Sequence, residues 1–391
     1  MTAITALTAV SAAGRGRAAL LRSLRARRSG LRPDDFSSAP GWIGRVDGVE
    51  AHALPAGLER FDCRNNRLAD LALQTDGFAR EVAAARDFYG AHRIAVVLGT
   101  STSGVLSAEQ AFADRDEAGA LPHAFHYAGT QDLFSAGDYV RTLLGLRGPA
   151  MVVSVACASS ARAFVDARQW LDAGLCDAAV VGGVDTLCRM TLRGFAALDL
   201  VSPDPCRPGD RDRSGISVGE AAGFALLERR GARAPAVLDL LGAGCSSDGH
   251  HMSAPHPAGA GAATAMGAAL ADAGLDPGAV DYVNLHGTGT RANDAAEDLA
   301  VAAVLGTDVP CSSTKGWTGH TLGACGVLEA VVAAQCIADG LLPGALGVQT
   351  PDPAFQARLL TENTAGPVRR VLSSSFGFGG VNCALVFGAP C

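Results

Sequence analysis

Aromatic residues are scarce in this 391-residue sequence, at 5% of the composition, and charged residues make up only 18%. So few charges, together with 48% hydrophobic residues, exclude an intrinsically disordered chain. No uninterrupted apolar run reaches the length of a membrane span, so no such span is predicted. The net charge of −7 argues against nucleic acid as a partner, because nucleic-acid-binding domains carry basic surfaces.

Cysteine is plentiful, with 11 residues, but it never occurs in CxxC pairs or at a regular spacing. This pattern argues against a disulfide framework of the secreted type and against a zinc site built from paired ligands. A reduced, cytoplasmic protein is therefore predicted. The 48 glycines predict many tight turns and close backbone contacts.

The N-terminal 33 residues contain several arginines and no acidic residue, as an organelle transit peptide does. The alternative is a first core strand from Ile4 to Val10, followed by a basic surface helix from Gly16 to Arg28. We favour the strand and helix, because the strand runs directly into a turn and no cleavage-type break follows.

The two halves of the sequence follow one plan, which predicts a duplicated fold. Each half contains a buried strand, a junction of small residues, a long helix of small residues and a further strand, in this order. We place the N-terminal half at residues 1–233 and the C-terminal half at residues 234–391. Alternating strands and helices predict an α/β protein with mainly parallel sheets, and sites in such proteins form outside strand ends.

One of these junctions carries a cysteine. A short apolar strand leads through Cys157 into a helix predicted from Ala158 to Ala173. The free N–H groups at the start of that helix favour negative charge, so they would lower the pKa of the thiol and stabilise an oxyanion. The alternative is that Cys157 is a small buried hydrophobic residue, as most cysteines are.

Two histidines follow predicted strands of the second half in glycine-rich loops. His286 lies in the segment LHGTGT and His320 in the segment KGWTGHTLG. A lone histidine is more often structural than catalytic, but one cysteine and two histidines, each at a strand end, favour nucleophilic catalysis. Zinc bound by these three residues is the competing interpretation, and no second short-spaced ligand pair supports it.

These motifs resemble those of elongating β-ketoacyl-acyl carrier protein synthases. The resemblance rests on Cys157 in VACASS, His286 in HGTGT, His320 in GHT and the segment GFGG at residues 377–380, and it covers nearly the whole chain. It implies the duplicated thiolase-like fold, layered α-β-α-β-α with two mixed, mainly parallel sheets. The segments RNN, LGTSTSG and ISVG most resemble synthases of the bacterial aryl polyene pigment pathway.

The resemblance also implies a reaction. Cys157 would accept an acyl chain from the phosphopantetheine of an acyl carrier protein, with the N–H groups of Cys157 and Phe378 as the oxyanion hole. His286 and His320 would hold the enolate that forms when malonyl-carrier protein loses its carboxylate, and Phe378 would act as a gate. No metal or other cofactor is expected. The resemblance adds the catalytic residue Lys315 and the supporting residues Thr288, Thr290, Asp294 and Glu329.

Acyl carrier protein is the substrate carrier that the resemblance implies, and the second subunit of a dimer would be an identical chain or a chain-length-factor-like subunit. The chain itself carries Cys157, which the inactive chain-length-factor type lacks. Val381 stands where many members have threonine, so one loop hydrogen bond is not expected. Small side chains at Thr102 and Ser103 would leave a wide acyl pocket. Docking of an acidic carrier would use six arginines: Arg60, Arg64, Arg67, Arg207, Arg211 and Arg213.

Three other functions stay open from the sequence. They are a housekeeping synthase of fatty acid elongation, a thiolase-like acyltransferase that uses coenzyme A, and a non-catalytic partner subunit. The loops that carry His286 and His320, together with Lys315, speak against the thiolase.

Overall fold

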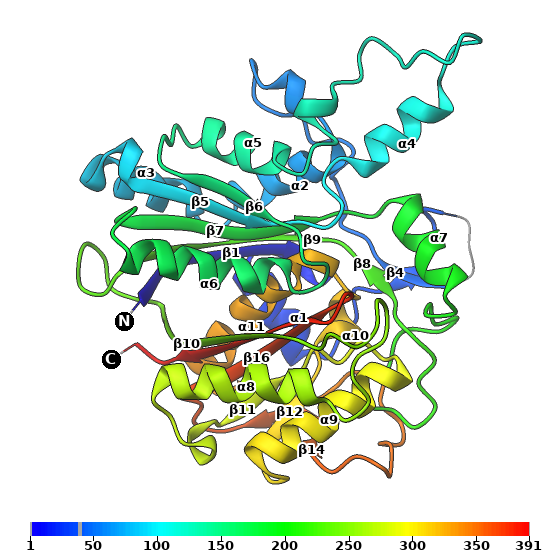
Figure 1. Cartoon of the computed structure of the whole chain (residues 1–391), viewed down its shortest axis with the longest axis vertical. Coiled ribbons are helices and arrows are strands. Elements are labelled where there is room, and N and C mark those ends of the chain that lie inside the picture. The colour runs from blue at the N-terminus through cyan, green and yellow to red at the C-terminus, as the bar shows by residue number, and fades with distance from the viewer. Residues whose placement is uncertain (1, 38–40, 391) are drawn as a thin grey trace.

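Helices and sheets alternate in five layers through the computed structural model, which describes residues 2–37 and 41–390 (Figure 1). One outer layer covers the sheet of the N-terminal half and the other covers the sheet of the C-terminal half, with a third group of helices between the sheets. The first outer layer contains α2 (Arg64–Leu73), α3 (Phe78–Tyr89) and α5 (Ser135–Leu143). The central layer contains α1 (Arg17–Arg25), α6 (Ser159–Asp172) and α11 (Cys325–Asp339). The second outer layer contains α8 (Ala260–Ala273) and α9 (Arg291–Leu305).

The two sheets have the same strand order, as expected for a duplicated fold. The first runs β6-β5-β7-β9-β1 and the second β12-β11-β16-β17-β10. In each, the first two pairs are parallel and the next two antiparallel. The strands are β1 (Thr2–Ser11), β5 (Ile94–Gly99), β6 (Ala150–Val153), β7 (Ala178–Asp185), β9 (Ala221–Arg229), β10 (Leu238–Ser247), β11 (Tyr282–Asn284), β12 (Pro310–Ser312), β16 (Arg370–Gly377) and β17 (Val381–Gly388).

The sheets are mixed, as expected, but parallel pairs are not in the majority among these ten strands: in each half two pairs are parallel and two antiparallel. Strands β1 and β10 also pair over three residues, so the two sheets join into one 12-stranded sheet, which was not predicted. The boundary at residues 233 and 234 stays a prediction; it falls between the end of β9 and the start of β10.

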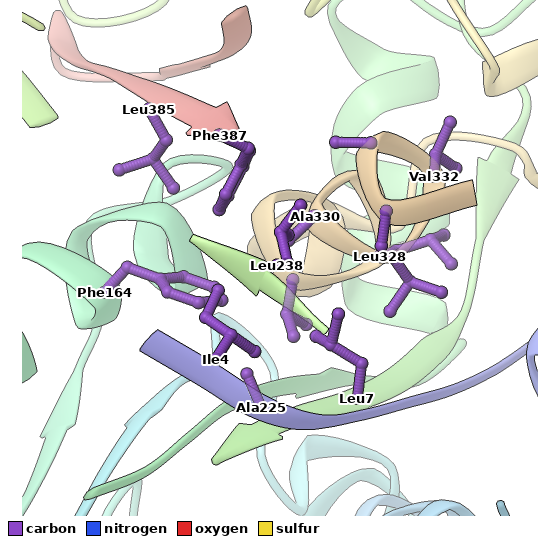
Figure 2. Packing of buried hydrophobic residues seen from close by; sticks show 14 of the residues in the cluster. Ile4, Leu7, Phe164, Ala225, Leu238, Leu328, Ala330, Val332, Leu385 and Phe387 are labelled. Carbon is purple, nitrogen blue, oxygen red and sulfur yellow. The ribbon is translucent and has the colours of Figure 1, made fainter. Parts of the chain in front are cut away.

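The central layer holds the largest core cluster, because both sheets turn an apolar face towards it. Figure 2 shows Phe164 of α6 and Leu328 of α11 among side chains from strands of both halves. Small residues let these helices come close: a Cβ added at Gly326 would lie 2.5 Å from the backbone nitrogen of Ala161. The segment Leu322–Asp339 is long and apolar enough to cross a membrane, which the sequence analysis did not anticipate, and 83% of it is buried inside the protein as a core helix.

The N-terminal segment forms β1 and α1, so the strand and helix expected there are confirmed. Three helices were not predicted: α3, α7 (Arg189–Ala197) and α9. The remaining elements are short, apart from α4 (Val105–Ala113): β2 (Gly14–Arg15), β3 (Arg32–Pro33), β4 (Trp42–Gly44), β8 (Val218–Gly219), α10 (Lys315–Thr318), β13 (Leu341–Leu342), β14 (Arg358–Leu359), β15 (Thr364–Ala365) and the 3-10 turns Glu59–Phe61, Ala91–Arg93, Tyr127–Gly129, Pro277–Ala279 and Leu322–Ala324.

The contact between α6 and α11 gives a stability prediction. We expect Gly326→Ala to lower the free energy of unfolding by about 2 kcal/mol, because the new methyl group overlaps the backbone of Ala161. Gly267→Ala in α8 is the matched control, since a Cβ there meets no atom within 4 Å and should add about 0.5–1 kcal/mol. Urea titrations followed by circular dichroism measure both changes. Equal transition midpoints for the two variants would contradict the close packing of α6 and α11.

Candidate active site

Cys157 lies in a tight turn between β6 and α6. The preceding residue, Ala156, has a φ of +52°, a conformation that non-glycine residues adopt at a cost. The hydroxyl of Ser159 fixes the turn: it accepts a hydrogen bond from the N–H of Val155 at 3.0 Å and donates one to the carbonyl of Ala156 at 2.5 Å. The strained turn places the thiol ahead of the first turn of α6, where it is 5% exposed.

Both histidines reach this thiol from the other half of the chain. Nε2 of His320 lies 3.0 Å from Sγ of Cys157, and the rings of His286 and His320 are 5.2 Å apart at an angle of 82°. His286 follows β11, and His320 lies between α10 and α11. One ligand atom from each of the three residues lies within 4.8 Å of the other two. The structure therefore brings together three residues that are far apart in the sequence.

A buried ion pair supports the histidine loops. Nζ of Lys315 donates to Oε1 of Glu329 at 2.8 Å and also to the carbonyl of His286, and the hydroxyl of Ser375 reaches the other oxygen of Glu329. Burial disfavours the charged form of Lys315, but the Glu329 carboxylate outweighs this and raises the pKa of the ammonium. Lys315 is therefore a fixed positive charge that ties the His286 loop to α11.

Burial sets the protonation state of the cluster. Burial, and next the positive charge of Lys315, hold the pKa of His286 and of His320 well below the usual range, so both imidazoles are neutral at pH 7. Burial also raises the pKa of the Cys157 thiol. This corrects the expectation that the helix N-terminus lowers that pKa: the thiol is almost fully desolvated, and desolvation disfavours the thiolate.

An acidic side chain that the sequence analysis missed holds the loop behind Cys157. Asp185 is fully buried at the end of β7 and accepts hydrogen bonds from the backbone of Ser101 and of Gly323. The hydroxyl of Thr102 also donates to Asp185, at 2.7 Å, and the hydroxyl of Ser103 donates to backbone carbonyls. Neither Thr102 nor Ser103 lines the cavity that opens on Cys157. The structure of this chain thus uses both side chains to hold the loop, and their contact with an acyl chain stays a prediction.

A cavity of about 260 Å³ leads to the three reactive groups. Thr288 and Thr290 line it, with their hydroxyls 2.9 Å apart, and Phe378 stands 37% exposed with its ring 5.7 Å from that of Phe195. The backbone N–H of Phe378 hydrogen-bonds the thiol of Cys157. Phe378 therefore has its main chain at the reactive sulfur and its ring against the wall of the cavity.

Asp294 and Glu297, on α9, hold the loop that carries His286. Asp294 accepts from the N–H of Gly289 at 3.1 Å, and Glu297 accepts from the N–H groups of His286 and Gly287 at 2.7 Å each. Burial raises the pKa of Glu297 to about 8. Glu297 was not proposed as a site residue. Its position three residues after Asp294 places both carboxylates on one face of a helix, and this spacing could have identified it.

Asn382 anchors the loop that carries Phe378. Its amide donates to Oδ1 of Asp248 at 2.8 Å, and the N–H of Asp248 donates to the carbonyl of Gly380 at 2.8 Å. Val381 packs against the central core instead of contributing a polar contact. Val381 therefore adds no side-chain hydrogen bond to this loop, and the side chain of Asn382 holds it.

Cys325 is a further group that the sequence analysis missed. Its sulfur lies 3.2 Å from Nδ1 of His320, on the side of the ring opposite Cys157. The hydroxyl of Thr321 donates to the same sulfur, at 3.5 Å. A thiol can donate or accept in this contact; we expect the S–H of Cys325 to donate to Nδ1, which would leave the ring proton of His320 on Nε2, facing Cys157.

Four of the six arginines proposed for docking remain accessible: Arg60, Arg67, Arg207 and Arg211. Arg64 and Arg213 are buried, and their role in docking was predicted wrongly. Arg64 pairs with Glu220 at 2.6 Å, and Arg213 pairs with Asp294 at 3.3 Å and Asp352 at 2.6 Å. A run of charged residues in the sequence does not show which of the side chains point into the protein and which remain at the surface.

The donor set of Cys157 and the two histidines also suits a zinc ion with an open position. The charge nearby argues against it: Lys315 opposes protonation of both imidazoles, and the same positive potential opposes a dication at that point. The absence of a bound metal stays a prediction.

A duplicated α/β fold with a buried thiol and two neutral imidazoles at the end of a cavity defines an acyl-transferring condensing enzyme. The model of the beta-ketoacyl synthase N-terminal domain matches residues 2–232, and that of the C-terminal domain matches residues 238–349. The chain belongs to the beta-ketoacyl synthase family.

Relatives and solved structures agree with this assignment. A 3-oxoacyl-[acyl-carrier-protein] synthase 2 of Vibrio cholerae is 32% identical over 85% of this chain and 87% of its own length. Nodulation protein E of Rhizobium sp. strain N33 is 32% identical over 98% of both chains. A chain of the complex of ketosynthase ApeO with chain length factor ApeC, from Xenorhabdus doucetiae, superposes with a TM-score of 0.91 at 36% identity, covering 99% of this chain and 98% of that one.

The raised pKa of Cys157 predicts how its reactivity depends on pH. Below its pKa the thiol is protonated, so the rate of alkylation by iodoacetamide should keep rising from pH 7 to pH 9 as the reactive thiolate fraction grows. Mass spectrometry of the peptide that contains Cys157 follows the reaction. A rate that is already constant near pH 7 would show that the helix N-terminus, and not burial, governs this thiol.

The contact of Cys325 with His320 predicts a positioning role. Cys325→Ala removes the donor to Nδ1, and we expect the rate of malonyl-thioester decarboxylation to fall about 2- to 10-fold, with little change in KM, since a hydrogen bond contributes about 0.5–1.5 kcal/mol. Cys325→Ser keeps a donor and should recover most of that rate. Equal rates for the alanine and serine variants would contradict the role.

Proposed function

We propose that this enzyme condenses an acyl chain held on Cys157 with a malonyl group, and that both substrates arrive on the phosphopantetheine of an acyl carrier protein. The observation that carries the proposal is the cluster of Cys157, His286 and His320 at the end of a cavity of about 260 Å³. Two relatives are 3-oxoacyl-[acyl-carrier-protein] synthases, which supports the choice of carrier.

In the first half-reaction the sulfur of Cys157 attacks the carbonyl of the acyl thioester. The negative oxygen is held by the backbone N–H groups of Cys157 and Phe378, which act as an oxyanion hole. The tetrahedral adduct then expels the pantetheine sulfur, and the proton of Cys157 ends on that leaving thiol. One thioester has formed and one has broken, so this step is neutral in charge.

In the second half-reaction a malonyl thioester enters and its carboxylate leaves as carbon dioxide. The electron pair of the broken bond moves to the thioester oxygen, where Nε2–H of His320 and the imidazole of His286 donate hydrogen bonds to the enolate. Neutral imidazoles suit this work, because they donate without transferring a proton to the enolate. The carbanion attacks the acyl group on Cys157, and the thiolate released takes up a proton.

We further propose that the product enters a pigment pathway of the aryl polyene type. The similarity to the ApeO–ApeC complex supports this, and housekeeping fatty acid elongation is the alternative. Because β6 is the last strand of its sheet and is half-buried, its open edge suits pairing with a second chain, either an identical one or a chain length factor. The ten described cysteines are free, which supports a reduced cytoplasmic location.

Arginines that stay accessible provide a docking surface for an acidic carrier. Arg60 and Arg67 lie on one segment, and Arg207 and Arg211 on another near the loop of Asp294. Each already has an acidic neighbour, so docking would rely on the summed charge and not on one free cation.

Separate assays of the two half-reactions test the function. Purified protein incubated with acyl-carrier protein should gain one acyl group on Cys157, and Cys157→Ala should gain none. His286→Ala and His320→Ala should still be acylated, whereas decarboxylation of malonyl-carrier protein should fall about 100- to 1,000-fold, as for other lost oxyanion donors. Cys176→Ala is the control, because Cys176 is buried away from the cavity.

The same assays separate the competing functions. Acylation by acyl-coenzyme A but not by acyl-carrier protein would indicate a thiolase-like acyltransferase. Full product formation by the Cys157→Ala variant together with a partner subunit would indicate a non-catalytic chain. The mass of the acyl chain trapped on Cys157 in the producing cell would distinguish a polyene from a saturated fatty chain.

A further inference from the structure

Two cysteines outside the active site face each other across neighbouring strands. Cys245 of β10 and Cys383 of β17 are direct register partners in an antiparallel pair, and their sulfurs lie 3.1 Å apart. Directly opposed residues in antiparallel strands have Cα atoms about 4.5 or 5.5 Å apart, and both separations lie within the range that a disulfide spans. We propose that Cys245 and Cys383 form a reversible disulfide when the enzyme meets a peroxide.

The surroundings give the two thiols different roles. Cys245 is half-buried and can meet a small oxidant, whereas Cys383 is fully buried in the central core. The hydrogen bond from Cys383 lowers the pKa of Cys245, and the guanidinium of Arg162 in α6 lowers it further. Burial and the negative charge of Asp166 raise this pKa, but their effect is smaller. Burial and the same hydrogen bond raise the pKa of Cys383. Cys245 is therefore the attacking sulfur and Cys383 the resolving one.

The chemistry balances with a peroxide as the oxidant. The thiolate of Cys245 attacks one peroxide oxygen, the O–O bond breaks, and the sulfur becomes a sulfenic acid while an alcohol or water leaves. The thiol of Cys383 then attacks that sulfur and expels water, which forms the S–S bond. Two electrons pass from the two sulfurs to the peroxide. A low-molecular-weight thiol reverses the step by exchange.

The position of the pair links it to the gate of the active site. Beyond Cys245, the register continues to Ser247 opposite Val381, and Asp248 then binds Gly380 and Asn382. A bond between Cys245 and Cys383 would fix the two strands directly below the loop that carries Phe378. Oxidation is therefore expected to slow exchange of the backbone amides in that loop.

Peptide mapping after peroxide treatment tests the proposal. We would use the full-length Cys157→Ala enzyme, so that the active-site thiol is absent, and treat it with hydrogen peroxide. The expected result is a cross-linked pair of peptides containing Cys245 and Cys383, two hydrogens lighter than the reduced pair and restored by dithiothreitol. Free thiols at both positions, or a sulfinic acid at Cys245 without a cross-link, would overturn the proposal.

Two variants in the same background separate the roles. In Cys383→Ala the resolving thiol is gone, so dimedone should label Cys245 as a sulfenic acid, whereas the parent should show almost no label there. Cys176→Ala is the matched control and should leave the cross-link unchanged, because Cys176 has no thiol partner among the described residues. Equal dimedone labelling of Cys245 in the parent and in Cys383→Ala would contradict a resolving role for Cys383.

Discussion

The close contact between α6 and α11 is the constraint on which the active site depends. Gly326 and Ala161 meet backbone to backbone, so the two central helices lie against each other at their N-terminal ends. Cys157 precedes one of these helices and His320 precedes the other. A larger side chain at Gly326 would separate the helices, and with them a sulfur and a nitrogen that are 3.0 Å apart. Packing of small residues that do not line the cavity thus sets the reactive geometry.

Electrostatics then decides what the cluster can do. Burial, and next the positive charge of Lys315 in its pair with Glu329, keep the two imidazoles neutral. Neutral imidazoles donate hydrogen bonds to a developing enolate without protonating it, which a decarboxylative condensation requires. The same burial that keeps the histidines neutral also raises the pKa of the Cys157 thiol, so the protonated form is favoured.

Several interpretations of the sequence fail for one physical reason: the direction of a side chain depends on the fold. Arg64 and Arg213 belong to charge-rich segments, yet both turn inward to buried carboxylates. The contact of Thr102 and Ser103 with an acyl chain stays a prediction, but the structure gives their hydroxyls a role that the sequence did not suggest, holding the loop behind Cys157. Asp185 acts through partners from distant segments, such as Gly323, so no local pattern marks it. The register of β10 with β17, which opposes Cys245 and Cys383, is equally invisible in the sequence.

The amino-acid sequence by itself determined most of the order of strands and helices, the duplication and the identity of Cys157, His286 and His320 as reactive candidates. These features are local: they depend on apolar periodicity, on glycine-rich turns and on residue types at strand ends. Only the tertiary structure decided the distances within the cluster, the neutral state of the imidazoles and the partners of the buried charges. These depend on desolvation and on contacts between residues more than one hundred positions apart, such as His320 with Cys157, which the folded chain alone creates.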